Sequence, residues 1–189
     1  MSARRAFLAQ GSAVLLAGCA ATGLRQDITP RPPRDALASF VLEGRAVIRQ
    51  GSRADSVHLS WEHSEGRDTI SFANMLGMQL AELQRDAQGA RWLSADGERV
   101  EAYSADALIA RLTHDPVPID ALALWVTGRA APGAALQLDA QGRMLGAQEA
   151  GWTVRILAYE NEQANALPAQ LEIERGALRI RLAIESWQF

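Results

Sequence analysis

The sequence predicts a mainly β domain, an unclosed antiparallel β-barrel of about eleven strands whose short helices form a lid over a hydrophobic cavity. Most of the chain after residue 38 alternates apolar and polar residues with period two, which is typical of half-buried strands. The pattern changes to the 3.6-residue period of helices over 104–127. A single sheet of that many strands must curl or close, and the resulting barrel encloses more volume than its side chains fill.

Five or six short strands are expected in the first half of the domain. They cover 40–47, 57–62, 69–74, a stretch containing Leu80 and Leu83, a stretch around Trp92, and 100–103. Turn residues at 86–89 and 96–97 separate the later strands, so neighbours in sequence pair as antiparallel hairpins. The first half is therefore predicted to be a meander.

Two helices are expected in the middle of the chain. Ser104 is a suitable N-cap for a helix whose apolar positions Leu108, Ile109 and Leu112 follow helical spacing. The prolines in 115–118 end it. A second short helix is expected over 119–127, with Gly128 as its terminator.

Strands resume after the second helix. The expected strands are 136–138, 144–148, 152–159, 171–174 and 178–187. In the last of these, Leu178, Ile180, Leu182 and Ile184 alternate with polar or small residues and are expected to point inward.

The N-terminal residues predict an exported, lipid-anchored protein. Residues 1–18 have a basic start, a short apolar run and small residues before Cys19, as in a cleaved signal. The apolar run is shorter than the roughly 20 residues of a membrane-spanning helix. Cys19 is the chain's single cysteine and resembles the lipidated residue of a bacterial lipobox. An ordinary signal peptide containing a cysteine is the alternative, and Arg4-Arg5 leaves Sec and twin-arginine export both open.

The N-terminal pattern divides the chain into three predicted segments. Residues 1–18 are the lipoprotein signal peptide, 19–37 are the lipidated N-terminus with an extended, proline-containing tether, and 38–189 form a single domain. Ala20 after the cysteine favours sorting to the outer membrane. We therefore expect a periplasmic-face location in the outer membrane, with the lipid on Cys19.

Composition and motifs argue against several functions. A net charge of −3 disfavours nucleic acid as a partner and disfavours anionic lipid held by charge alone. His58, His63 and His114 lack metal-ligand spacing and are expected to be solvated, as are the scattered carboxylates. No P-loop, dinucleotide turn or nucleophile elbow occurs. We therefore expect the protein to be a monomer that is not an enzyme and that has no metal site and no cofactor.

The apolar residues supply the candidate site. Met75, Leu76 and Met78 surround a turn between two strands, where polar residues and glycine are usual. They either fold back onto the core or form an apolar probe for a membrane or hydrophobic partner. The cavity is expected to be lined by inward strand residues and lid residues. These are Phe40, Leu42, Leu59, Trp61, Ile70, Phe72, Trp92, Leu108, Leu112, Leu122, Trp125, Trp152, Ile180 and Ile184.

From about residue 38 to its end the chain resembles the LolB family of outer-membrane lipoprotein receptors. The matching segments are 40–45 (FVLEGR), Trp61, 74–77 (NMLG), 117–128 (VPIDALALWVTG), 139–142 (DAQG), 151–154 (GWTV), Tyr159, 167–168 (LP), 179–182 (RIRL) and Trp187. Each segment is short, and their order together with the lipobox carries the resemblance.

The resemblance implies a fold similar to the periplasmic carrier LolA and a function without catalysis. The implied receptor accepts lipoproteins from LolA, shelters their acyl chains and inserts them into the outer membrane. The family's exposed leucine corresponds to Leu76, although Met75 stands where relatives have proline.

Two alternatives remain open from the residues. One is a lipocalin-like outer-membrane lipoprotein that binds another hydrophobic ligand, for which the apolar hairpin tip has no purpose. The other is a structural or assembly lipoprotein with a filled core, which the volume of the cavity distinguishes.

Overall fold

The computed structural model describes residues 33–113 and 117–189. The expected signal peptide, Cys19, most of the expected tether and His114 lie outside the described residues. The first half contains β1 (Phe40–Gln50), β2 (Arg53–Ser64), β3 (Arg67–Ala73), β4 (Gln79–Asp86), β5 (Gly89–Ser94) and β6 (Arg99–Ala102). The middle contains α1 (Ala105–Thr113) and α2 (Ile119–Val126). The second half contains β7 (Ala135–Leu138), β8 (Met144–Glu149), β9 (Trp152–Tyr159), β10 (Pro168–Arg175) and β11 (Leu178–Gln188).

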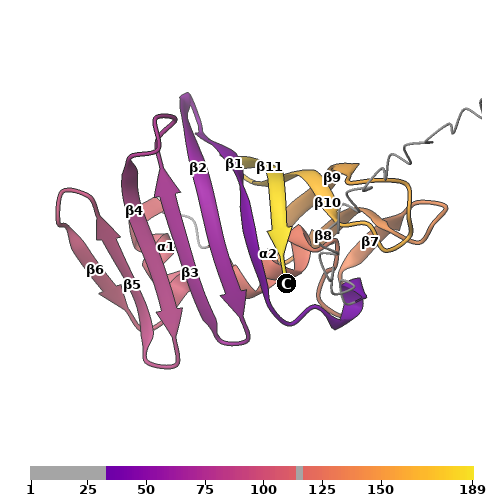
Figure 1. Cartoon of the computed structure of the whole chain (residues 1–189), viewed down its shortest axis with the longest axis horizontal. Coiled ribbons are helices and arrows are strands. Elements are labelled where there is room, and N and C mark those ends of the chain that lie inside the picture. Colours follow the sequence, from indigo (N-terminus) through magenta and orange to yellow (C-terminus); the bar gives the residue numbers. More distant parts are fainter. Residues whose placement is uncertain (1–32, 114–116) are drawn as a thin grey trace, which may run out of the picture. The chain divides into compact units, whose positions relative to one another are not determined.

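All eleven strands form one antiparallel sheet in the order β6-β5-β4-β3-β2-β1-β11-β10-β9-β8-β7. Each half of the chain is thus a meander, and the two meanders are joined where β1 pairs with β11 (Figure 1). The edges β6 and β7 are not neighbours in this sheet, so it stays open. The prediction of an unclosed antiparallel barrel of about eleven strands is confirmed.

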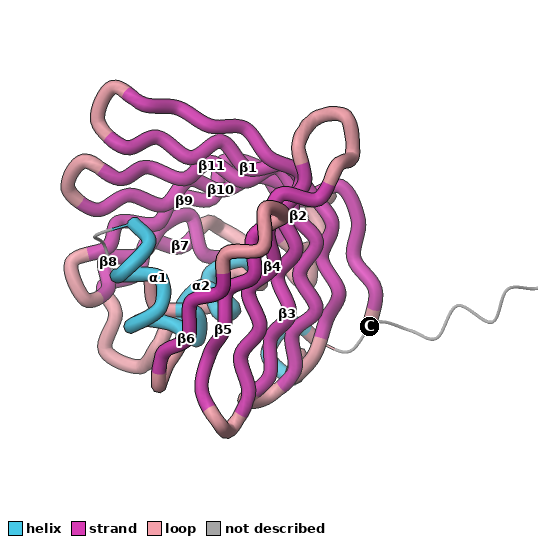
Figure 2. Tube along the Cα trace, turned by 90° about the vertical axis from the view of Figure 1, so that its left-hand side faces the viewer, coloured by secondary structure: helices cyan, strands magenta, loops and turns pink. Residues whose placement is uncertain are grey.

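The sheet curves around the two helices, which lie on its concave side (Figure 2). The helices connect β6 to β7, so the chain crosses the open side of the sheet there. This arrangement places the apolar face of the longer strands toward the helices and their other face toward solvent, whereas all residues of the edge strand β7 are exposed.

One glycine is required where the two meanders meet. The pairing of β1 with β11 shifts register between Glu43 and Gly44. A Cβ on Gly44 would collide with the backbone carbonyl of Ala183. Glycine at this position therefore allows β11 to approach β1 closely enough to continue the sheet.

Both helices begin and end as the sequence predicts. The Ser104 hydroxyl accepts a hydrogen bond from the backbone N–H of Ala107 at 3.2 Å, which caps α1. At the end of α2, Gly128 has a φ of 72°, and the N–H of Arg129 reaches back to the carbonyl of Leu124. That left-handed glycine ends the helix while satisfying one of its last carbonyls.

Residues 33–37 fall within the expected tether, yet they contact the domain. A 3₁₀ turn spans Arg34–Ala36, and the following Leu37 is buried. The Arg129 guanidinium donates to the carbonyl of Leu37 at 2.9 Å, which fixes this segment near the end of α2. The folded domain therefore extends N-terminally of residue 38.

Candidate functional site: an apolar cavity and an exposed hairpin

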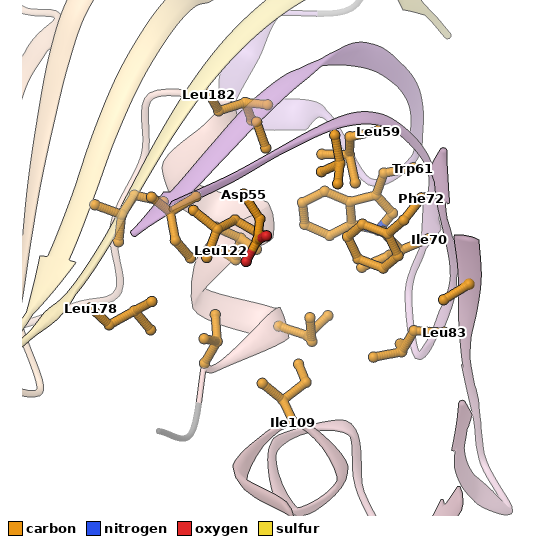
Figure 3. A pocket seen from close by; sticks show the side chains of 18 of the residues that line it. Asp55, Leu59, Trp61, Ile70, Phe72, Leu83, Ile109, Leu122, Leu178 and Leu182 are labelled. Carbon is orange, nitrogen blue, oxygen red and sulfur yellow. The ribbon is translucent and has the colours of Figure 1, made fainter. Parts of the chain in front are cut away.

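A cavity of about 480 Å³ lies on the concave side of the sheet (Figure 3). This volume falls within the range of about 300–1,000 Å³ that is usual for small-molecule sites. Its lining consists of Ala46, Ile48, Arg53, Asp55, Ser56, Val57, Leu59, Trp61, Ile70, Phe72, Leu80, Ala81, Leu83, Trp92, Ile109, Val117, Ile119, Leu122, Val126, Ile173, Leu178, Ile180 and Leu182. Apart from Arg53, Asp55 and Ser56, the lining side chains are hydrophobic.

The strand register explains why these side chains meet. Leu59 of β2 pairs with Phe72 of β3, and Trp61 pairs with Ile70. Ile70 in turn pairs with Leu83 of β4. Because directly paired residues share one face of a sheet, the apolar positions of neighbouring strands form one continuous wall.

Seven of the residues expected to line the cavity do so. They are Leu59, Trp61, Ile70, Phe72, Trp92, Leu122 and Ile180. They come from β2, β3, β5, α2 and β11, so the concave face was assigned correctly for these strands. Their role in ligand binding remains a proposal.

Phe40, Leu42 and Ile184 do not line the cavity, although they were expected to. They lie toward the end of the concave face opposite the β1–β2 hairpin, where aromatic rings fill the space. The ring of Phe40 packs edge-on against Trp61 at 5.2 Å and against Trp187 at 5.3 Å. Inward direction was right for these residues, but that end of the concave face is packed rather than hollow.

Trp125, Trp152 and Leu108 were also expected in the lining and are instead fully buried in the packed core. The two tryptophan rings contact each other, with centroids 5.9 Å apart. Leu108 is turned into the core, whereas its neighbour Ile109 lines the cavity, because successive helical residues point about 100° apart. The side chain of Leu112 lies outside the described residues.

Several lining residues were absent from the expected cavity set, although a sequence signal existed for some of them. Val57 lies on the same face of its strand as Leu59 and Trp61. Leu178 and Leu182, which were expected to point inward, lie on the same face as Ile180. Period two alone therefore places these residues on the concave face. Arg53 and Asp55 had no such signal, because charged residues at a strand end are ordinarily assigned to solvent.

A buried ionic cluster holds α2 against the first meander. The carboxylate of Asp68 accepts hydrogen bonds from Trp61 Nε1 at 2.8 Å and from Arg85 Nε at 2.6 Å, and His63 Nδ1 lies 2.7 Å from it. Arg85 also donates to Asp120 in the first turn of α2 at 2.6 Å. The expectation that His63 and all carboxylates are solvated was wrong here, because Asp68 is buried and needs several donors.

The charge of Arg85 is stabilised by this cluster. Burial by itself would lower the pKa of the guanidinium, but the hydrogen bond and charge of Asp120 and the charge of Asp68 outweigh it and raise the pKa. The guanidinium therefore links β3, β4 and α2 as a permanent cation.

The β3–β4 hairpin has a well-defined tip at 74–78. The side-chain oxygen of Asn74 accepts hydrogen bonds from the N–H groups of Leu76 at 2.9 Å and Met78 at 3.0 Å. The backbone N–H of Gly77 donates to the carbonyl of Asn74 at 2.9 Å, with φ of 81° at the glycine. These bonds leave Leu76 85% exposed, and Met75 and Met78 are exposed beside it. The tip does not fold back onto the core.

Two other hairpins, at 94–98 and 139–143, use a closely similar turn. In both, a polar first residue accepts hydrogen bonds through its side chain and a glycine follows three residues later. The position equivalent to Leu76 is Asp96 in one and Gln141 in the other, and both are exposed. The turn itself therefore does not require an apolar residue at Leu76.

A bulge connects this hairpin with the cavity. The pairing of β3 with β4 shifts register between Phe72 and Ala73, which leaves Leu80 without a partner on β3. A bulge re-aims a side chain, and Leu80 accordingly lines the cavity next to Ala81 while staying 41% exposed. Apolar side chains thus continue from the exposed tip to the cavity lip.

The described ranges 33–113 and 117–189 contain no cluster of three or more His, Cys, Asp or Glu residues that could hold a metal ion. None of the helices in these ranges combines the length and hydrophobicity that crossing a membrane requires.

An open antiparallel sheet curled around two helices, an apolar cavity and an exposed apolar hairpin together define a binding protein for hydrophobic ligands. The sequence model of one family, described as outer membrane lipoprotein LolB, matches residues 38–187. The chain therefore belongs to the LolB family of outer-membrane lipoproteins.

Curated relatives agree with this assignment. Outer-membrane lipoprotein LolB from Azoarcus sp. (strain BH72) is 36% identical, over 100% of this chain and 98% of the relative. The protein of the same name from Dechloromonas aromatica (strain RCB) is 32% identical, over 92% of each chain. Among solved structures, a DUF1329 family protein from Desulfovibrio piger superposes with a TM-score of 0.52 at 9% identity, over 82% of this chain and 87% of that one. The last comparison concerns the fold alone.

Proposed function

We propose that this protein is the outer-membrane receptor that accepts lipoproteins, shelters their acyl chains in the cavity and inserts them into the outer membrane. The observation that carries this proposal is the apolar cavity, whose lip is continuous with an exposed apolar hairpin, in a chain of the LolB family. A filled-core structural lipoprotein would not have the 480 Å³ cavity.

The hydrophobicity of the acyl chains makes such a receptor necessary. Each buried methylene contributes about 0.8 kcal/mol, so one acyl chain of about 16 carbons contributes on the order of 12 kcal/mol when it leaves water. A lipoprotein therefore cannot cross an aqueous compartment with its chains exposed. Contact with apolar walls is non-directional, which suits clients that share acyl chains and differ in their protein parts.

The donor of these clients is proposed to be the periplasmic carrier LolA. Transfer then runs downhill, from the carrier to this receptor and from the receptor to the bilayer. An open cavity suits an acyl-chain affinity between those of the carrier and the bilayer, because its walls shelter the chain without surrounding it.

Leu76, with Met75 and Met78, is proposed to contact the membrane during delivery. The side chain is held out by a hydrogen-bonded turn and has no packing role in the domain. Inserting an exposed leucine into hydrocarbon is favourable, so the tip guides the cavity lip to the bilayer surface.

Cys19 is proposed to be the lipidated N-terminus of the mature protein, with residues after it serving as the tether. Mass spectrometry of protein extracted from outer membranes is expected to find an acylated peptide that begins at Cys19. Retention of residues 1–18 without lipid would contradict this part of the proposal.

A two-step transfer assay tests the whole function. Purified receptor is mixed with a LolA–lipoprotein complex, and capture is measured before liposomes are added to measure delivery. The wall variants Phe72→Asp, Leu122→Asp and Ile180→Asp are expected to lose capture, because a charge in the apolar wall is costly beside an acyl chain. Leu157→Asp is the matched control, since Leu157 is an exposed leucine outside the cavity lining.

Circular dichroism of each variant shows whether the domain still folds. If folded wall variants from three different elements captured lipoprotein as well as the unchanged protein, the cavity would not be the acyl-chain site.

A further inference from the structure

The cavity lining is polar in one place, at the start of β2. Arg53, Asp55 and Ser56 line the cavity there, and the other lining residues are hydrophobic. Along β2, Arg53 and Asp55 share the alternation of Val57, Leu59 and Trp61, which line the cavity wall. The apolar face of the strand therefore becomes charged at its first two positions.

This pattern is the reverse of an ordinary strand end. Ala54, between the two charged residues, belongs to the opposite alternation of β2 and is small and apolar. If the charges served only solubility, the convex face would be the expected place for them. Instead, Asp55 extends into the cavity region in Figure 3, and its partner across the ladder is Ile48 of β1.

The two charges form a pair that keeps hydrogen-bond donors available. Arg53 Nε donates to Asp55 Oδ2 at 2.8 Å. The side chains are 79% and 53% exposed, so water and a ligand can both reach them. The bond to Asp55 uses Nε, so the terminal amino groups of this exposed guanidinium are accessible to a ligand. Asp55 thus orients the guanidinium by one edge and leaves its other donors open.

The position of the pair relative to the hairpin tip is fixed by the sheet register. Ala73, the last residue of β3, pairs with His58 of β2. The 74–78 tip therefore projects at the same end of the sheet as the start of β2, as Figure 1 also shows. The opposite end of the cavity is closed by Trp61 and its aromatic neighbours.

We propose that Arg53 and Asp55 form a polar subsite that binds the carbonyl group next to an acyl chain, as an ester or amide presents it. The terminal amino groups of Arg53 donate to the carbonyl oxygen, and Asp55 holds the guanidinium in position. The ligand then enters with its tail toward Trp61 and keeps its head at the end that carries Leu76. This inference rests on the proposed function and adds the orientation of the ligand.

The test uses two amphiphiles that differ by one carbonyl. Monopalmitoylglycerol carries an ester, and hexadecylglycerol carries an ether at the same place with a tail of the same length. Binding of both is measured by displacement of a fluorescent apolar probe from the cavity. The unchanged protein is expected to prefer the ester about fivefold, which corresponds to one partly solvated hydrogen bond to a charged donor.

Arg53→Met is expected to reduce that preference to about one, because methionine keeps an apolar stem and lacks the donors. Arg67→Met is the control. Arg67 is an exposed arginine at the start of β3, at the end of the sheet away from Arg53, and it does not line the cavity. Its ester preference is expected to stay about fivefold.

Three results would overturn the subsite. They are equal binding of ester and ether by the unchanged protein, an ester preference that survives Arg53→Met, and an equal loss of both ligands in Arg53→Met. In each of these cases the cavity still binds apolar tails, so the proposed function stands. Failure of both amphiphiles to bind the unchanged protein would instead contradict the cavity proposal itself.

Discussion

The first meander and the β8–β9 region of the second meander use the same alternating sequence pattern in two different ways. In the second meander, Trp152 of β9 packs against Trp125 of α2, and both rings are fully buried. In the first meander, Phe72 and Trp92 contact each other at 5.6 Å between centroids but face the cavity. The concave face is thus packed solid around β8, β9 and the Trp125 side of α2, whereas the first meander lines the cavity together with β10 and β11.

The position of α2 explains this difference. Its Trp125 donates through Nε1 to Glu149 of β8 at 2.9 Å, and the same carboxylate accepts from the N–H of Ala131 at 3.2 Å. Arg85 connects its first turn to β4 through Asp120. The helix is thus fixed against β8 while its Leu122 side faces the cavity. The packed β8–β9 region and its fixed helix provide the rigid support that lets the rest of the concave face remain open.

The strongest way to test this comparison is to truncate one aromatic ring in each half. Trp152→Ala removes a fully buried ring and leaves a new void, so unfolding is expected to become easier by about 3–5 kcal/mol. Phe72→Ala removes a half-buried ring that already borders a cavity, and the expected cost is about 1–2 kcal/mol. Urea unfolding followed by tryptophan fluorescence and circular dichroism measures both.

The two variants should rank in the opposite order for ligand binding, with the larger loss in Phe72→Ala. Phe72→Ala alters the wall directly, whereas folded Trp152→Ala keeps the lining residues. Equal stability losses for the two variants would contradict the division into a packed β8–β9 region and an open cavity wall.

A second comparison makes the same substitution, alanine to leucine, in both regions and expects opposite effects on stability. Ala147→Leu in β8 overfills a packed region and is expected to destabilise the domain by about 1–3 kcal/mol. Ala81→Leu in β4 extends into the existing cavity and is expected to stabilise the domain by about 1 kcal/mol while weakening acyl-chain binding. Thermal unfolding with and without a bound amphiphile measures both effects. Destabilisation by both leucines would indicate that the cavity wall is as tightly packed as the core.

Local patterns were sufficient to predict most of the fold. Ser104 and Gly128 fix the ends of the helices, and period two identifies strands whose inward faces were assigned correctly, including Leu178, Ile180 and Leu182. These features depend on neighbours in sequence, so they can be recognised without tertiary information. The open barrel followed from the number of strands and the central helices.

The boundary between cavity and core could not be predicted in the same way. Trp125 and Trp152 alternate or repeat as regularly as Trp61 and Trp92, yet only the latter two line the cavity. What separates them is the position of α2, which depends on contacts such as Trp125 with Glu149, 24 residues apart. Arg53 and Asp55 were missed for a related reason, because charge alone does not reveal that a strand end borders a cavity.

The hairpin tip is expected to give the smallest change in stability and a large change in function. Leu76→Glu should alter the free energy of unfolding by less than about 0.5 kcal/mol, since Leu76 makes no core contact. The equivalent turn positions already carry Asp96 and Gln141, so the backbone there accepts a polar residue. Capture of lipoprotein from the carrier is therefore expected to be unchanged.

Delivery into liposomes should be lost, because placing a carboxylate in hydrocarbon costs about 3 kcal/mol. Gln141→Glu adds the same charge to a turn of closely similar geometry in the other meander, and it is expected to deliver normally. A shared delivery defect would assign the effect to net charge rather than to the tip. Normal delivery by Leu76→Glu would show that the tip is an ordinary exposed turn. Unfolding of Leu76→Glu would show that Leu76 packs as part of the core. Loss confined to Leu76→Glu would mean that the first meander, which supplies most of the cavity wall, also carries the contact through which the ligand leaves.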